Sequence, residues 1–320
     1  MSANSEIAWT DATWNPFRGC TRVSPGCQNC YAERMAARGL PGLNSPTTGE
    51  QFAIMTPSGP RWTNQVELIE NQMDAPLRWR RPRRIFVNSM SDTWHKDFLY
   101  EQIADVVETT MAAPQHTYLF LTKRATGSRE FWGKFYRQYN KAELDAETMD
   151  DCAGRTHKAW PLAPFRNVWM GISAEDQQRF DARIEDLRGT PAAVRWLSLE
   201  PLLGPIDLAG RLDGIHWVVV GGESGPEARP CNVQWIRDIV RQCRAAGVPV
   251  FVKQLGAKPV VQACRQHHYD FGDEIGRKAR FSAVDKRHPS TGLWRVHLKD
   301  RKGGDLAEWP KDLRVREYPR

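Results

Sequence analysis

Three cysteines lie close together near the start of the chain and are the residues best suited to chemistry. Cys20, Cys27 and Cys30 follow the spacing C-x6-C-x2-C within "GCTRVSPGCQNCYAE". Cysteine thiolates bind zinc and iron–sulfur clusters. Cys30 directly precedes a predicted helix, whose N-terminal amides and dipole favour a thiolate. The trio predicts a metal centre, because unligated thiols on a polar loop would be exposed to oxidation.

The number of ligands separates the possible metals. A structural zinc site needs four ligands, and the fourth would come from a distant residue such as Cys264 or His267. A catalytic zinc ion uses three protein ligands, among which histidine and carboxylate are usual. A [4Fe–4S] cluster on three cysteines leaves one iron open to a substrate or cofactor. The cluster accounts for a motif of three cysteines, and zinc stays the alternative metal.

Composition narrows the class of protein. The chain has 320 residues, of which 41% are hydrophobic, and a single α/β barrel reaches this size. Seven cysteines in this length do not form a disulfide framework. We find neither a run of about 18 apolar residues nor a basic segment followed by an apolar one. The sequence therefore predicts a cytoplasmic protein without a membrane span.

The charge balance is compatible with an anionic partner. Basic residues number 45 and acidic residues 38, which gives a net charge of +7. The densest basic run is "RWRRPRR" at 78–84. This run is either a solvated connection into a strand or a phosphate-contacting patch, with Trp79 available for stacking. A nucleic acid or nucleotide is the predicted substrate class.

Apolar runs and amphipathic segments alternate along the chain. The apolar runs are near-continuous, which is typical of strands buried on both faces of a parallel sheet. They lie at 7–10, 84–89, 118–123, 168–173, 194–199, 216–222 and 248–254. The helical periodicity falls at 31–39, 99–113, 177–189 and 233–247, whereas 200–215 looks less helical.

This alternation predicts an α/β fold with a parallel (β/α) barrel, complete or partial and TIM-barrel-like. A doubly wound open sheet is the alternative, but no G-x-G-x-x-G follows any of the predicted strands. We place the barrel in residues 1–256, with insertions at about 40–83 and 125–165. Residues 257–320 form a predicted C-terminal extension.

Polar residues follow every predicted strand. In a parallel barrel these positions share the C-terminal face, where barrel enzymes build their sites. Buried charges need partners, so the acids and lysines are expected to pair with each other or with a polar ligand. The main candidates are Asp11, Ser89, Ser91, Asp92, Lys123, Ser173, Glu175, Glu200, Glu223 and Lys253. Gly221 and Gly222 precede Glu223 and would let the backbone approach a ligand closely.

A cysteine trio after the first strand of a β/α barrel resembles the radical S-adenosylmethionine superfamily. The resemblance implies a [4Fe–4S] cluster on Cys20, Cys27 and Cys30, with its open iron bound to S-adenosylmethionine. It also implies reductive cleavage of that cofactor to a 5′-deoxyadenosyl radical, which abstracts hydrogen from a substrate. An electron donor such as flavodoxin or ferredoxin is implied as a partner.

The whole chain also resembles a family of phage-encoded and bacterial proteins. The resemblance is carried by "WTDATWNPFRGC", "SPGCQNCYAERM", "VNSMSDTWH", "LFLTKR", "MGISAEDQ", "WLSLEPLLGPID", "WVVVGGESGPEARP", "VFVKQLG" and "DRKGGDLAEWP". The spacing departs from the C-x3-C-x2-C that is usual among radical enzymes. Asn29 stands where an aromatic residue usually precedes the last cysteine, and the Gly-Gly-Glu triplet follows the sixth strand instead of the second.

Site roles follow by position. Ser89, Ser91 and Asp92 follow the second strand and are the predicted contacts for the methionine end of the cofactor. Ser173 and Glu175 complete the predicted cofactor contacts. Lys123, Glu200, Glu223 and Lys253 are predicted to line the pocket and act on the substrate.

Two other functions remain open on the sequence alone. One is a zinc-stabilised nucleic-acid-binding protein of a phage or mobile element, without radical chemistry. The other is a metal-dependent hydrolase, which the scattered positions of the eight histidines disfavour. A binding protein has no need of acids and lysines at the barrel mouth, so the radical enzyme is the preferred hypothesis.

Overall fold

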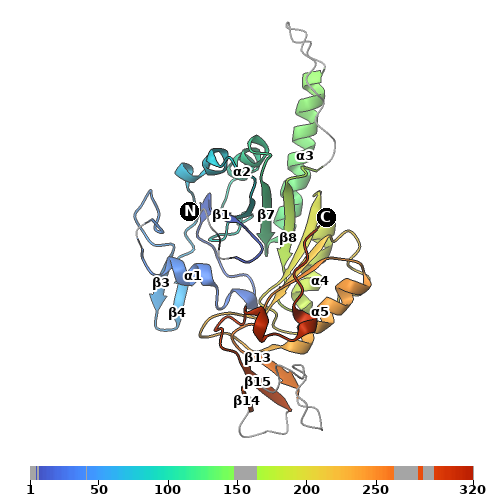
Figure 1. Cartoon of the computed structure of the whole chain (residues 1–320). Helices are drawn as coiled ribbons and strands as arrows, with labels where there is room; N and C mark the ends of the chain where they lie inside the picture. The colour runs from blue at the N-terminus through green and yellow to red at the C-terminus, as the bar shows by residue number, and fades with distance from the viewer. Residues whose placement is uncertain are drawn as a thin grey trace. The chain divides into compact units, whose positions relative to one another are not determined.

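The main sheet of the protein is parallel and follows chain order. The computed structural model describes residues 5, 7–40, 42–147, 164–262, 280–283 and 292–319. Its largest sheet has seven strands in the order β1-β6-β7-β8-β9-β10-β12. Strands β1, β7 and β8 of this sheet are labelled in Figure 1. Consecutive parallel strands joined by helices are the arrangement of a (β/α) barrel. The predicted fold class is confirmed as α/β with a partial, TIM-like parallel barrel.

Six of the seven predicted strands coincide with strands of this sheet. The seven strands are β1 (Ala12–Trp14), β6 (Arg84–Val87), β7 (Thr117–Thr122), β8 (Val168–Ser173), β9 (Val194–Leu199), β10 (Trp217–Gly221) and β12 (Val250–Gln254). Most of their side chains are buried, which explains the near-continuous apolar runs.

The first strand was predicted at 7–10, and that position is wrong. Residues 7–10 form a turn whose Trp9 is buried against Phe86, with ring centroids 5.1 Å apart. Asp11 consequently stands before β1 and not after it. Its carboxylate accepts a hydrogen bond from the Arg84 backbone amide at the start of β6, at 2.7 Å. Asp11 therefore lies at the opposite end of the strand from the predicted site face.

The helices confirm the helical periodicity. They are α1 (Tyr31–Ala36), α2 (Tyr100–Ala112), α4 (Gln177–Arg188) and α5 (Val233–Ala245), and residues 200–215 contain no helix. A further helix, α3 (Ala125–Glu147), occupies the first part of the predicted insertion at 125–165. Phe131, Trp132 and Phe135 bury one face of α3. None of the described helices is long and apolar enough to cross a membrane.

The chain divides into two compact units. The first comprises residues 1–21, 35–171 and 185–194, and the second comprises 22–34, 172–184 and 195–320. Strands β1, β6 and β7 belong to the first unit, β10 and β12 to the second, and β8 and β9 have residues in both. The predicted boundary after residue 256 stays a prediction.

Short elements of the first unit lie within the predicted insertion at 40–83. Strands β3 (Ala53–Thr56) and β4 (Gly59–Trp62) form an antiparallel hairpin. Strand β2 (Phe17–Arg18) pairs with β5 (Glu67–Leu68), directly before the first cysteine. Two short 3₁₀ helices follow, η2 (Glu70–Gln72) and η3 (Ala75–Arg78). This insertion therefore supports the chain that leads into Cys20.

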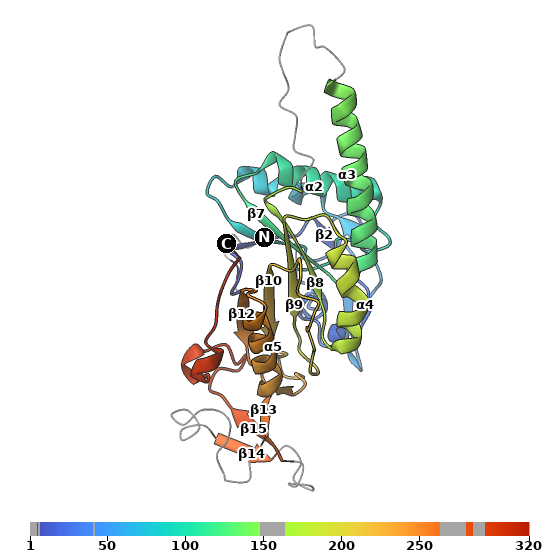
Figure 2. The ribbon, with the colours of Figure 1, turned by 90° about the vertical axis from the view of Figure 1, so that its right-hand side faces the viewer.

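Helix α5 covers part of the sheet in the second unit. It packs on β10 and β12 (Figure 2) and buries an apolar face of Val233, Ile236, Ile239, Val240 and Cys243. Cys243 is a core residue, as its helical spacing predicted. A second sheet has four strands in the order β11 (Cys231–Asn232), β13 (Pro259–Gln262), β15 (Leu293–His297) and β14 (Arg280–Ala283). Most of this sheet comes from the predicted C-terminal extension.

The end of the chain binds to β12, the last strand of the main sheet. Residues after the 3₁₀ helices η5 (Leu306–Glu308) and η6 (Lys311–Leu313) run antiparallel to it, with a bridge between Phe251 and Arg316. The Val252 amide donates to the Val315 carbonyl at 2.9 Å, and the Glu317 amide donates to the Val250 carbonyl at 3.1 Å. The backbone groups on this side of β12 therefore have partners from the same chain.

Candidate functional site

The three cysteines of the motif are partly exposed. They lie on the segment between β2 and α1, which we call the cysteine loop (residues 19–30). Cys27 ends a 3₁₀ turn, η1 (Pro25–Cys27), and Cys30 directly precedes α1, as predicted. Cys20 belongs to the first unit, whereas Cys27 and Cys30 belong to the second.

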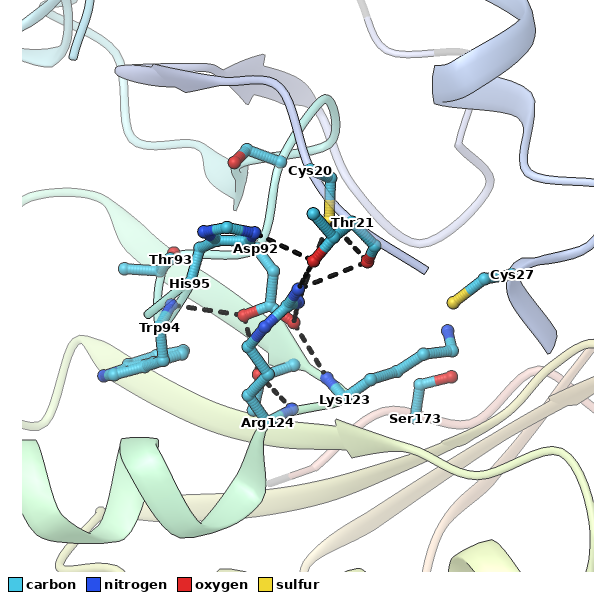
Figure 3. A network of polar contacts seen from close by, with 12 residues as sticks. Cys20, Thr21, Cys27, Asp92, Thr93, Trp94, His95, Lys123, Arg124 and Ser173 are labelled. Atoms are coloured by element: carbon cyan, nitrogen blue, oxygen red, sulfur yellow. Dashed lines mark hydrogen bonds and ion pairs between the residues drawn. The ribbon is translucent and has the colours of Figure 1, made fainter. Parts of the chain in front are cut away.

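A partly buried arginine lies beside Cys20 in the first unit. Arg124 follows β7, and its Nη1 is 3.8 Å from the Cys20 Sγ (Figure 3). Its Nη2 donates to the Thr21 carbonyl at 3.2 Å and to the Thr21 Oγ1 at 2.8 Å. A positive charge next to a cysteine sulfur favours the thiolate, which is the form that binds metals.

Asp92 fixes this arginine. The Asp92 Oδ2 is 3.1 Å from the Arg124 Nη1, and the two side chains are only 9% and 14% exposed. The same carboxylate accepts hydrogen bonds from the Thr122 Oγ1 at 2.7 Å and the Lys123 amide at 3.0 Å. Burial opposes the charge of Arg124, but the Asp92 carboxylate and the Cys20 sulfur together raise its pKa. Arg124 is therefore held as a permanent cation.

His95 also belongs to the polar network around Thr21 in the first unit. Its Nε2 lies 2.9 Å from the Thr21 Oγ1 (Figure 3). Burial and the charge of Arg124 lower the pKa of His95, in spite of the nearby carboxylates of Asp97 and Asp92. The imidazole is consequently neutral at neutral pH and serves as a hydrogen-bonding partner of the cysteine loop.

The two serines predicted as cofactor contacts bind the chain before Cys20. The Ser91 Oγ donates to the Gly19 carbonyl at 2.6 Å, and the Ser89 Oγ donates to the Asn15 Oδ1 at 3.0 Å. Gly19 has a φ of +80°, and a Cβ there would meet the Gln65 carbonyl oxygen at 2.0 Å. Only glycine fits this position. The serines therefore support the loop, and cofactor binding by them stays a prediction.

A second network holds the cysteine loop in the second unit. The Glu223 Oε2 accepts hydrogen bonds from the Arg229 amide at 2.8 Å and from the Asn29 Nδ2 at 3.0 Å. The Arg229 Nη2 lies 2.6 Å from the Glu223 Oε1, and the Arg229 Nη1 donates to the Pro25 carbonyl at 2.9 Å. Burial raises the pKa of Glu223, but hydrogen bonds from Arg229 and Asn29 outweigh it and lower the pKa overall.

The glycines before Glu223 allow a close approach of a neighbouring segment of the chain, and their approach to a ligand stays a prediction. A Cβ on Gly222 would lie 2.3 Å from the Leu255 carbonyl oxygen, and one on Gly221 would lie 3.2 Å from the Gln254 carbonyl oxygen. The backbone of β10 is thus packed directly on the chain at the end of β12. In the described part of the chain, these glycines make room for a neighbouring strand.

Glu175 links the cysteine loop to α4. Its Oε1 accepts a hydrogen bond from the Gly26 amide at 2.9 Å, and its Oε2 is 3.1 Å from the Arg183 Nη1. The Glu175 side chain is 0% exposed and that of Arg183 is 10% exposed. Arg183 also donates to the Ser173 carbonyl at 2.7 Å. Glu175 therefore holds the residue immediately before Cys27.

The remaining predicted pair lies at the ends of β9 and β12. The Lys253 Nζ is 2.7 Å and 2.9 Å from the two carboxylate oxygens of Glu200. The Gln254 Nε2 donates to the Glu200 Oε1 at 3.2 Å. The Glu200 and Lys253 side chains are 16% and 23% exposed, so this ion pair keeps some access to solvent.

The arginine partners are the functional residues that the sequence reasoning missed. Asp92, Glu175 and Glu223 pair with arginines, whereas only Glu200 pairs with a lysine, as we expected of the acids in general. Arg183 lies on α4, which begins two residues after Glu175, so the helix that follows the strand could have been searched for its partner. Arg124 directly follows Lys123 at the end of β7, so its position after a strand was the only signal that the sequence offered.

The available His, Cys, Asp and Glu side chains limit which metal centre the cysteine loop can hold. Across residues 5, 7–40, 42–147, 164–262, 280–283 and 292–319, no three His, Cys, Asp or Glu side chains form a group that could hold one metal ion. Cys264 and His267, the predicted sources of a fourth zinc ligand, lie outside the described residues. Burial raises the pKa of both Cys231 and Cys243 to about 12, so these two thiols pack as neutral groups.

The fold and the loop together define a partial parallel β/α barrel with a cysteine motif supported by strand-end carboxylates. The chain belongs to the family described as "Protein of unknown function (DUF5131)", whose profile matches residues 4–287. Neither a curated protein nor a solved structure matches the chain.

Proposed function

We propose that the chain is a radical S-adenosylmethionine-type enzyme whose cysteine loop binds a [4Fe–4S] cluster. The observation that carries the proposal is the presence of three partly exposed cysteines on one loop of a partial β/α barrel. Cys20, Cys27 and Cys30 would each bind one iron. Such a cluster supplies an electron and an open iron site when bound.

A cluster accounts for a motif of three cysteines better than a structural zinc ion does. Structural zinc needs four protein ligands. In a cluster each thiolate binds a different iron, and one iron stays open. The positive charge of Arg124 beside Cys20 also favours the thiolate form of Cys20, which is the form that binds a metal.

The strand-end acids have a positioning role in this proposal. Glu175 and Glu223 use their carboxylates to hold the backbone and side chains next to Cys27 and Cys30. Asp92 does the same for Cys20 through Arg124. The Glu200–Lys253 pair would bind and orient polar groups of the cofactor or substrate, because both side chains retain some exposure.

We propose a nucleic acid or nucleotide as the substrate class, and a flavodoxin or ferredoxin as the electron donor. Two arginines of the basic run, Arg80 and Arg81, are exposed. Arg78 and Arg84 are already paired with Asp74 and Asp11. The exposed pair supports contact with phosphates, which neutralise guanidinium groups efficiently.

Metal analysis of protein purified without oxygen tests the proposal. We expect iron and acid-labile sulfide near cluster stoichiometry, with the broad visible absorbance of thiolate-bound iron. The variants C20S, C27S and C30S should lose iron, whereas C243A, which removes a buried thiol, should retain it. Incubation with S-adenosylmethionine and a reductant should then release 5′-deoxyadenosine. A colourless protein carrying stoichiometric zinc would instead support the nucleic-acid-binding alternative.

A further inference from the structure

Cys27 and Cys30 form a pair within the cysteine loop that can react without Cys20. The two are separated by Gln28 and Asn29, so their spacing is C-x-x-C, and both belong to the second unit. Both residues are partly exposed, and both are thiols in the structure. C-x-x-C is the spacing of dithiols that change between the thiol and disulfide forms. Such a pair needs no metal ion and no residue of the first unit.

The backbone between the two cysteines is a closed turn. The Cys30 amide donates to the Cys27 carbonyl at 3.3 Å, and Gln28 and Asn29 form the turn between them. A four-residue turn holds its first and last Cα atoms less than about 7 Å apart. A disulfide joins Cα atoms that are about 4.4–6.8 Å apart. The two ranges overlap, so bond formation requires rotation of the two side chains and not rearrangement of the loop.

The second unit anchors this turn on both sides. The Gly26 amide, directly before the first cysteine of the pair, donates to the Glu175 Oε1 at 2.9 Å. The Asn29 Nδ2, directly before the second cysteine, donates to the Glu223 Oε2 at 3.0 Å and to the Glu227 carbonyl at 2.7 Å. Groups that are held close together before they react have a smaller entropic cost of reaction. The anchors therefore favour a bond between the two sulfurs.

We propose that Cys27 and Cys30 form a reversible disulfide when no metal is bound to the cysteine loop. The inference goes beyond the proposed function, because it concerns the metal-free chain and leaves Cys20 out. The bond would close a ring of only four residues. Short rings gain the least stability from a cross-link, so small thiols can reduce the bond again. In the disulfide form neither sulfur is a thiolate, so neither can bind a metal.

The reaction is a thiol–disulfide exchange in two steps, with a small disulfide such as glutathione disulfide as the oxidant. The thiolate of one cysteine attacks a sulfur of the oxidant, breaks its S–S bond and releases one small thiol, which leaves a mixed disulfide. The thiolate of the other cysteine attacks the protein-bound sulfur of that mixed disulfide and releases the second small thiol. The two cysteines lose two electrons, the oxidant gains them, and the two cysteine protons end on the two small thiols.

Mass spectrometry of the full-length, metal-free protein tests the inference. Chelator-treated protein is equilibrated in glutathione buffers of increasing disulfide content, alkylated with N-ethylmaleimide and digested with trypsin. Residues 23–34 are released as one peptide that contains both cysteines and no other. We expect this peptide to become lighter by two hydrogens and to escape alkylation in the oxidising buffers. Excess reduced glutathione should restore the dithiol.

Matched variants separate this pair from the other thiols. C20S should keep the disulfide, and so should C243A, which removes a buried thiol. In C27S or C30S the remaining cysteine should be alkylated or carry glutathione. A wild-type peptide that is alkylated or glutathionylated at both cysteines in every buffer would overturn the inference, as would loss of the disulfide in C20S. Iron and sulfide analysis of protein purified without oxygen tests the proposed function separately, so the two failures are distinguishable.

Discussion

The buried carboxylate of Glu175 accepts a hydrogen bond from the backbone amide of Gly26, with the Gly26 nitrogen 2.9 Å from the Glu175 Oε1. A Cβ on Gly26 would lie 2.9 Å from the carboxylate carbon. The glycine and the glutamate therefore fit each other closely, one residue before Cys27. Changes at either position should act on the cysteine loop.

Replacement of Glu175 by alanine should destabilise the second unit strongly. The change leaves Arg183, which is 10% exposed, without its carboxylate. Breaking one side of a buried ion pair costs about 3–5 kcal/mol in the free energy of unfolding. Chemical denaturation measures this loss. The control E185A breaks the more exposed pair of Glu185 with Arg188 and should cost at most about 1 kcal/mol. Equal losses in the two variants would contradict the prediction.

Gly19 and Gly42 allow backbone strain to be separated from steric conflict. Both have left-handed conformations, with φ of +80° and +81°. A Cβ on Gly19 would meet the Gln65 carbonyl oxygen at 2.0 Å, whereas a Cβ on Gly42 would meet nothing within 4 Å. G42A should therefore cost only about 1–2 kcal/mol, for the left-handed conformation. G19A should cost clearly more and should reduce metal binding, as thermal unfolding and metal analysis would reveal.

Glu223 should make stability depend on pH in the acid range. Its native pKa is lowered from 4.5, because hydrogen bonds from Arg229 and Asn29 outweigh burial. The unfolded chain therefore binds a proton at a higher pH than the folded chain does. The stabilisation by the Glu223 carboxylate is complete above pH 4.5 and is lost as pH falls through the lower native pKa. E223Q should be less stable than wild type at neutral pH, and the difference should shrink in acid.

Denaturation curves at several pH values check this expectation. The control E227Q removes one negative charge from an exposed side chain on the same loop while keeping all contacts of Arg229 with Glu223. A difference between E223Q and wild type that stays constant down to strongly acidic pH would argue against the assignment.

If the chain is the proposed radical enzyme, Lys253 should matter for turnover and not for binding of the cluster. It binds the Glu200 carboxylate at 2.7 Å at the end of β12. Among the described residues, the hydrogen bonds of this pair do not reach a cysteine. K253M should keep wild-type iron and sulfide but lower 5′-deoxyadenosine formation by about a hundredfold, the usual effect of removing one electrostatic group from an active site. Full activity in K253M would exclude Lys253 from the site.

The exposed arginines allow a direct test of the predicted anionic partner. If nucleic acid binds the protein, the logarithm of affinity should fall with the logarithm of salt, by about 0.7–0.9 per neutralised phosphate. R80Q/R81Q should lower both the affinity and the steepness of this dependence. R78Q should change them less, since Arg78 already pairs with Asp74 at 2.8 Å. Wild-type protein that binds neither DNA nor RNA at low salt would remove this partner class.

The strands and helices of the barrel could be predicted because burial leaves a strong local pattern. The run "WVVVGG" is apolar since β10 is buried along its whole length. The first strand was misplaced because β1 is only three residues long. In addition, the neighbouring Ile7 and Trp9 are apolar for packing in a turn. Apolar composition alone does not distinguish a buried strand from a turn that packs apolar side chains.

The candidate site could be predicted only in part. The positions of Glu175 and Glu223 after their strands follow from the sequence, but their orientations depend on partners from elsewhere in the chain. Arg183 is on a helix, and Asn29 is on the cysteine loop, 194 positions from Glu223. Long-range pairing of this kind leaves no periodic signal, so the sequence did not indicate that these acids hold the cysteine loop; their contacts with a cofactor or substrate stay a prediction.

The residues that follow the 3₁₀ helix η6 have a protective effect on the main sheet. Val315 and Glu317 satisfy the outer backbone groups of β12, and the Trp217 indole donates to the Glu317 carbonyl at 2.8 Å. A free sheet edge invites pairing with other chains. Removing the last few residues should therefore expose β12 as an unpaired edge strand and promote aggregation, even though every residue of the cysteine loop would still be present.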